Sequence, residues 1–133
     1  MRTKIFINLA VADVRRSMAF FKALGYSHNP QFTDETAACI VISEEIYVMV
    51  LTHAKFREFA PKGICDTTQF NEALLTLSCE SRQAVDDLVA KAVAAGATTF
   101  EQPTDHGFMY SHSFIDLDGH GWGLFHMNGM PPK

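Results

Sequence analysis

The sequence is poor in cysteine, and the few cysteines present are not arranged to bond with one another. Cys39, Cys65 and Cys79 are odd in number and show no Cys-x-x-Cys spacing. Scattered cysteines of this kind are typical of buried free thiols rather than of a disulfide framework or a zinc site. We therefore expect a protein of a reducing compartment, the cytoplasm.

The sequence also lacks long apolar runs, basic clusters and the motifs of nucleophilic catalysis. No segment approaches the roughly 20 apolar residues that cross a bilayer, and the start of the chain does not read as a signal peptide. The formal charge of −4, without a cluster of Lys or Arg, argues against nucleic acid and anionic membranes as partners. Neither Gly-x-Ser-x-Gly nor a phosphate loop is present, so nucleophilic catalysis has no support.

What is present is an ordinary globular composition and two similar halves. With 133 residues, 47% of them hydrophobic, the chain fits a single domain, residues 1–133. Apolar residues at helical spacing predict two helices, which Asp13 and Ser81 begin and Gly25 and Gly96 end. The helices are expected at residues 14–24 and 82–95, and the strands at residues 4–9, 26–32, 37–43, 46–52, 73–79, 97–102, 109–115 and after residue 119.

The clearest local signal is the turn Asp116-Leu117-Asp118-Gly119, which lies between two apolar runs. Aspartate side chains favour the entry to a turn by accepting bonds from the backbone, and Gly119 can adopt the positive φ that such a turn needs. We predict a tight hairpin between the last two strands. The segment 104–108, with Gly107, is expected to be a polar loop.

This order of elements, together with the turn, resembles the vicinal oxygen chelate superfamily, which includes glyoxalase I, bleomycin- and fosfomycin-resistance proteins and extradiol dioxygenases. The residues that carry the resemblance are the run from Ile5 to Asp13, Ser17, Phe20-Phe21, Ala94-Ala95-Gly96 and Asp116 to Gly119. The resemblance implies an α+β fold of two βαβββ modules whose curved mixed sheets form a cup. Module one would cover about 1–53, a connector about 54–71 and module two about 72–128, and the protein would be a homodimer.

Because side chains alternate along a strand, the pattern also predicts which of them face the cup. Trp122 and Leu124 would instead lie in the core. The predicted cup residues are Phe6, Asn8, Ala10, Tyr47, Met49, Leu51, Leu74, Thr76, Ser78, Gly121, Gly123, Phe125 and Met127. This wall suits a small, flat, partly apolar molecule.

The superfamily's metal ligands, carried over by resemblance, would fall on Phe6, Met49, Leu74 and Gly123. None of these side chains offers the carboxylate oxygen or imidazole nitrogen that the relatives' cations require. We therefore expect no metal at the family position and no cofactor. A site relocated to the histidines near the C-terminus stays open as an alternative.

Those histidines differ in the role that the sequence suggests for them. His106 and His112, with Tyr110, are predicted to make polar contacts at the mouth of the pocket. His120 is expected on the surface of the hairpin turn, and His126 is expected to be structural.

The function predicted from these patterns is binding of a small, partly apolar molecule in the cup, with no catalytic residue identified. The predicted ligand-binding residues are Phe6, Asn8, Tyr47, Met49, Thr76, His106, Tyr110, His112, Gly123 and Phe125. The alternative is a lyase, isomerase or dioxygenase of the glyoxalase type, acting on a small carbonyl or phenolic compound.

Overall fold

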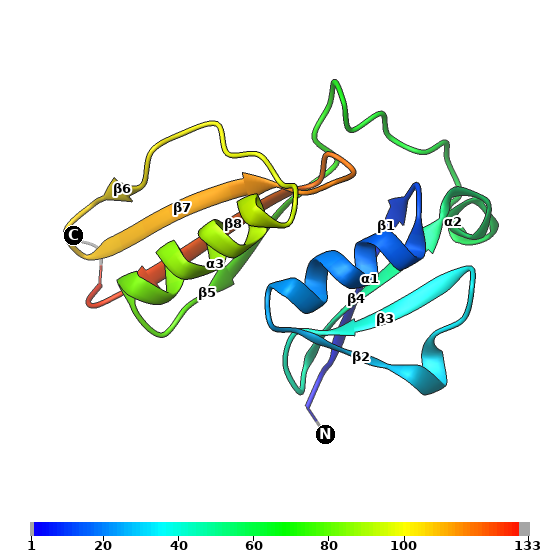
Figure 1. Cartoon of the computed structure of the whole chain (residues 1–133), viewed down its shortest axis with the longest axis horizontal. Coiled ribbons are helices and arrows are strands. Elements are labelled where there is room, and N and C mark those ends of the chain that lie inside the picture. The colour runs from blue at the N-terminus through cyan, green and yellow to red at the C-terminus, as the bar shows by residue number, and fades with distance from the viewer. Residues whose placement is uncertain (1, 131–133) are drawn as a thin grey trace. The chain divides into compact units, whose positions relative to one another are not determined.

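The computed structural model describes residues 2–130, which divide into two compact units, one ending at Asp66 and the other beginning at Thr67. Each unit contains a four-stranded mixed sheet with one long helix on it, as Figure 1 shows. The predicted α+β architecture of two βαβββ modules is confirmed, and neither sheet closes on itself.

The first unit follows the predicted order of strand, helix and three strands. Its sheet has the order β1-β4-β3-β2, in which β1 and β4 are parallel and the other pairs are antiparallel. The elements are β1 (Ile5–Val11), α1 (Val14–Ala23), β2 (Ser27–Asn29), a 3-10 turn (Pro30–Phe32), β3 (Ala37–Val41), β4 (Ile46–Thr52) and α2 (His53–Phe59). Helix α2 begins the segment that the sequence assigned to the connector.

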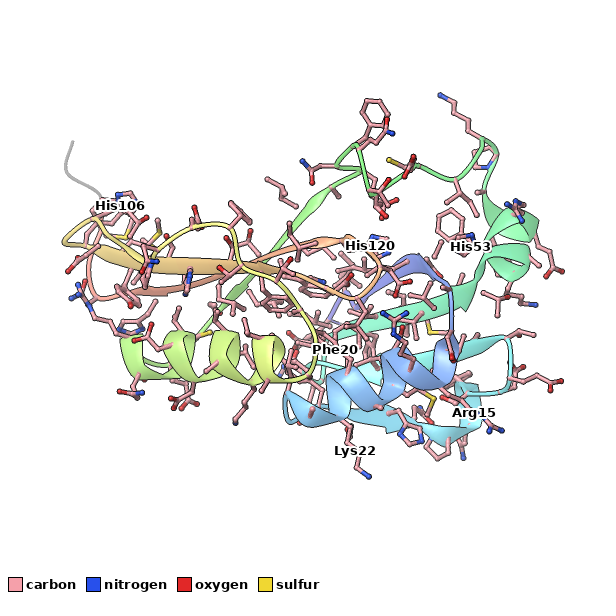
Figure 2. The ribbon with its side chains drawn as sticks, turned by 45° about the horizontal axis from the view of Figure 1, so that its top comes forward. Arg15, Phe20, Lys22, His53, His106 and His120 are labelled. Atoms are coloured by element: carbon pink, nitrogen blue, oxygen red, sulfur yellow. The ribbon has the colours of Figure 1, made fainter. Side chains whose placement is uncertain are left out.

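Helix α1 begins at its predicted cap, since the Asp13 side chain accepts a hydrogen bond from the backbone N–H of Arg16. Val14, Phe20 and Phe21 are buried on one face of the helix. Lys22 points away on the opposite face, as Figure 2 shows. The helix therefore covers the sheet with an apolar stripe and leaves its charged residues outside.

The second unit repeats this plan with the sheet order β5-β8-β7-β6, in which β5 and β8 are parallel. Its elements are β5 (Leu74–Ser78), α3 (Arg82–Ala94), β6 (Thr104–Asp105), β7 (Met109–Ile115) and β8 (Gly121–Met127). Val85, Val89 and Ala92 of α3 are buried, as are Phe114, Trp122 and Leu124 of β7 and β8. Helix α3 therefore covers one face of this sheet, and the opposite face carries the candidate site.

Two predicted strands differ from the structure. The strand expected at 97–102 is replaced by a single bridge between Thr98 and Ile115, and β6 forms at Thr104–Asp105, where a loop was expected. Pro103 lacks a backbone N–H and interrupts the ladder, so pairing resumes only after it. The strand expected at 26–32 ends at Asn29, because Pro30 starts a 3-10 turn that the Asn29 side chain caps.

The hairpin turn between β7 and β8 is confirmed. Asp116 Oδ1 accepts from the backbone N–H groups of Asp118 and His120 at 2.9 and 3.0 Å. Gly119 has a φ of 89°, and a Cβ on it would lie 2.7 Å from the carbonyl oxygen of Thr67. The turn therefore needs glycine for two reasons, its backbone conformation and this close approach.

Within residues 2–130 no helix is long and apolar enough to cross a membrane.

Candidate functional site

A pocket of about 520 Å³ lies in the second unit. Its volume is in the range of known small-molecule sites, roughly 300–1,000 Å³. The pocket borders the face of the sheet that α3 leaves open, together with the segment that precedes β6. It is lined by Leu74, Thr76, Phe100, Glu101, Met109, Ser111, His112, Ser113, Phe114, Gly121, Trp122, Gly123, Leu124, Phe125 and Met127.

The strand register shows which side chains share the pocket face. Gly123 pairs with Thr76 on one side and with Ser113 on the other. Phe125 pairs with Ser78 and with Ser111 in the same way. Paired residues point to the same face, so small polar side chains of β5 and β7 flank the aromatic ring of Phe125.

The two glycines of β8 make room for side chains of the neighbouring strand. A Cβ at Gly121 would lie 3.1 Å from Leu74 Cδ2, and one at Gly123 would lie 3.1 Å from Thr76 Oγ1. Close packing therefore accounts for both glycines. As a result, Leu74 and Thr76 extend over β8 and form part of the pocket wall.

The pocket wall also carries the carboxylate of Glu101, a residue that was not among the predicted site residues. Ser113 Oγ donates a hydrogen bond to Glu101 Oε1 at 2.5 Å. The backbone carbonyl of Glu101 accepts from His112 Nε2 at 2.9 Å, and the Thr99 hydroxyl donates to the carbonyl of Ser113 at 3.0 Å. These bonds attach the segment before β6 to the outer edge of β7.

Tyr110 and His112 were predicted to make polar contacts at the mouth of the pocket. His112 is in the described lining of the pocket, and Tyr110 is not. Tyr110 pairs with His126 and His112 pairs with Leu124, so both side chains lie on the helix side of the sheet. The Tyr110 hydroxyl donates to Asp86 of α3 at 2.6 Å, and this bond raises the pKa of Tyr110. Alternation along β7 therefore turns Ser111 and Ser113 to the pocket face of the sheet, opposite to Tyr110 and His112.

His106 belongs to the loop between β6 and β7 and is absent from the described lining of the pocket. The β6 end of this loop is held by Arg82, which donates to both carboxylate oxygens of Asp105 at 2.6 and 3.0 Å. The Arg82 bonds hold the pKa of Asp105 below its ordinary value. Figure 2 shows His106 and His120 at opposite ends of the β7–β8 hairpin, so they do not form one group.

His120 is buried, with an exposed fraction of 4%, which corrects the expectation of a surface residue. Its Nδ1 lies 2.7 Å from Glu72 Oε1, a contact that brings the chain before β5 against the turn. His126 is structural in the way the sequence suggested, because its Nδ1 lies 3.0 Å from the carbonyl oxygen of Cys79.

The other predicted site residues lie in the first unit. Phe6 pairs with Tyr47 and Asn8 pairs with Met49, so these four share one face of that sheet. The rings of Phe6 and Tyr47 stack with their centroids 4.7 Å apart. A separate hollow of about 520 Å³ there is lined by Asn8, Leu51, Phe56, Phe59, Ala60 and Pro61. Asn8 is thus the only predicted site residue in the described lining of the first-unit hollow, whereas Thr76, His112, Gly123 and Phe125 line the pocket of the second unit.

The donor set at the superfamily's metal positions does not fit a cation. Phe6, Met49, Leu74 and Gly123 supply a phenyl ring, a thioether, an isobutyl group and a hydrogen. A Cβ at position 123 would lie 3.1 Å from the Thr76 hydroxyl, so a side chain there would crowd that group. In the part of the chain that the structure describes, no three His, Cys, Asp or Glu side chains are grouped to hold an ion.

Comparison with known proteins agrees with this architecture. The family model for the bleomycin resistance protein-like N-terminal region matches residues 3–43. A hypothetical protein from S. aureus is 30% identical, with 95% of each chain covered and a TM-score of 0.78. Over residues 3–43 the chain resembles bleomycin resistance protein-like N-terminal regions, and over nearly its whole length it shares its fold with the S. aureus protein.

Other solved structures share the fold at lower identity. A glyoxalase/bleomycin resistance protein/dioxygenase family enzyme from Burkholderia phytofirmans is 18% identical, with 92% of this chain and 96% of that chain covered and a TM-score of 0.76. The fosfomycin resistance protein from Listeria monocytogenes is also 18% identical, with 100% and 95% covered and a TM-score of 0.68. Among curated proteins, none matches the chain.

Proposed function

We propose that this protein binds a small, partly apolar molecule in the pocket of the second unit, without the metal of its relatives. The observation that carries the proposal is the apolar surface of that pocket. Leu74, Phe100 and Met127 line it with exposed fractions of 73%, 66% and 38%. Large apolar side chains left open to water in one concave patch are characteristic of ligand sites.

The polar groups of the pocket are few and fixed, which suits recognition of one orientation of a ligand. Thr76, Ser111 and Ser113 contribute hydroxyls from neighbouring strands, so a sheet rather than a loop positions them. A flat apolar body could lie against Phe125 while its polar substituents meet these hydroxyls. The donor set described above gives no support to chemistry through a bound cation, so we assign binding rather than the glyoxalase or dioxygenase reaction.

The proposal is tested with 1-naphthalenemethanol, a flat neutral probe, by saturation-transfer NMR and calorimetric titration. Ser111→Phe places a ring in the pocket and should abolish binding of the probe. Gln83→Phe adds the same ring on an exposed position of α3 and should leave binding unchanged. Equal binding by the protein and both variants would show that the probe does not occupy this pocket.

We also propose a homodimer in the cytoplasm. Strands β1 and β5 stand at the ends of their sheets, and such edges favour pairing with another chain. Light scattering at several concentrations should give twice the mass of the 14.8 kDa chain, and a single-chain mass throughout would refute the dimer.

A further inference from the structure

The geometry points to a ligand class: we propose that Glu101 makes the pocket selective for molecules that carry an amine on a flat apolar body. This inference rests on the proposed function, since it concerns the same pocket. To the proposed function it adds the charge of the preferred ligand and the residue that recognises this charge.

The position of the Glu101 carboxylate is fixed by its partner. Ser113 pairs with Gly123 across β7 and β8, so the Ser113 side chain is on the pocket face of the sheet. Because Ser113 Oγ donates to Glu101 Oε1, the carboxylate must also stand on that face. The hydrogen bond from His112 Nε2 to the backbone carbonyl of Glu101 holds the same residue against the edge of β7.

The carboxylate has acceptor capacity left for a ligand. An ionised carboxylate offers about four acceptor positions on its two oxygens. Ser113 uses one of them, and within residues 2–130 no Lys or Arg is paired with Glu101. Arg82 of α3 is bonded to Asp105 of β6 instead.

The residues around Glu101 make its negative charge important for the choice of ligand. Of the described residues that line the pocket, Glu101 alone carries a formal charge with His neutral. Glu101 is exposed and water screens its charge in part, but Phe100 and Met109 border the same space, and a ligand seated against them would displace some of that water and strengthen an ionic hydrogen bond. An ammonium group would therefore be favoured over a hydroxyl, and a carboxylate would be repelled.

The test compares three naphthalene probes that differ in their polar group: 1-naphthylmethylammonium, 1-naphthalenemethanol and 1-naphthoate. In calorimetric titration at pH 7.5 the cation should bind most tightly, the neutral molecule less tightly and the anion least. The affinity for the cation should exceed that for the neutral molecule about tenfold, which corresponds to about 1.4 kcal/mol. Glu101→Gln keeps an acceptor for Ser113 but removes the charge, and it should bring the cation to within about twofold of the neutral probe. Glu80→Gln removes an identical charge from an exposed position outside the pocket lining and should preserve the order.

Each outcome decides between the two proposals. Neutral and cationic probes that bind equally to the wild type, and that Ser111→Phe excludes, would overturn the amine selectivity and leave the proposed function standing. A cation preference that survives Glu101→Gln would overturn the role of Glu101. Failure of all three probes to bind the wild type would count against the proposed function, and the selectivity would fall with it.

Discussion

Asp116 and Trp122 fix the hairpin that carries most of the pocket lining, and the coupling between these two residues can be measured. Asp116 Oδ1 accepts from two backbone N–H groups, and Oδ2 accepts from Trp122 Nε1 at 2.9 Å. Both oxygens of the carboxylate are therefore used as acceptors. An amide has one oxygen, so the Asn side chain of Asp116→Asn cannot accept from the backbone N–H groups and from Trp122 Nε1 at the same time. Its own N–H must then face one of these donors.

The expected magnitude follows from the cost of a poorly paired buried donor, about 1–3 kcal/mol. Burial raises the pKa of Asp116, while His120 and the bond from Trp122 oppose that rise, so the charge itself also affects stability. A double-mutant cycle with Trp122→Phe cancels the effect of losing the Asp116 charge, because Asp116→Asn removes that charge both in the wild type and in the Trp122→Phe variant. We expect a coupling free energy of about 1–2 kcal/mol between positions 116 and 122.

The assay is urea unfolding followed by circular dichroism at pH 7.5, since Trp122→Phe removes the single tryptophan. With a slope of about 2 kcal/mol/M, Asp116→Asn should lower the midpoint by about 0.5–1 M in the wild-type background. It should lower the midpoint much less in the Trp122→Phe background, because there the amide N–H meets no indole donor. A coupling energy below about 0.5 kcal/mol would refute the claim that this carboxylate holds the turn and the indole together.

Two further predictions concern the second unit. The pKa of Tyr110 is raised by its bond to Asp86, so the stability from this phenol is complete below its ordinary pKa and is lost as pH rises through the raised value. Absorbance at 295 nm should therefore show one phenol titrating earlier in Asp86→Asn than in the wild type, and superimposed curves would count against the bond. Gly119→Ala should destabilise the protein by about 2 kcal/mol or more, since the residue has a positive φ and no room for a Cβ. Gly63→Ala, with no atom within 4 Å of the added Cβ, is the matched control, and equal melting temperatures for the two variants would contradict the explanation.

The fold could be predicted because local signals agreed with one another along most of the chain. Asp13 and Ser81 cap their helices as expected, and Gly119 turns the hairpin as expected. These signals act over a few residues, so the sequence alone contains them. Pro103 was recognised as a strand breaker, but the position at which pairing resumes depends on the edge of β7, which only the folded sheet provides.

The site was less predictable, because it depends on the phase of a strand and on a contact between distant segments. Residues 110–114 alternate aromatic or imidazole side chains with small hydroxyl ones, and the sequence alone does not decide which set faces the pocket. Burial of Phe114 against α3 decides the phase and turns Ser111 and Ser113 to the pocket. Glu101 gave no periodic signal, since it belongs to an irregular segment that Ser113 and His112 hold in place.

The central claim is that the open face of the β5–β8 sheet is a ligand site, and backbone chemical-shift mapping tests it most directly. Titrating ¹⁵N-labelled protein with 1-naphthylmethylammonium should produce its largest shifts at Thr76, Glu101, Ser111, Ser113 and Gly123. The hollow lined by Asn8 and Phe56 in the first unit serves as the internal comparison. Saturable shifts confined to the second-unit pocket are the predicted result, and saturable shifts centred on the first-unit hollow, with the pocket unchanged, would contradict the account.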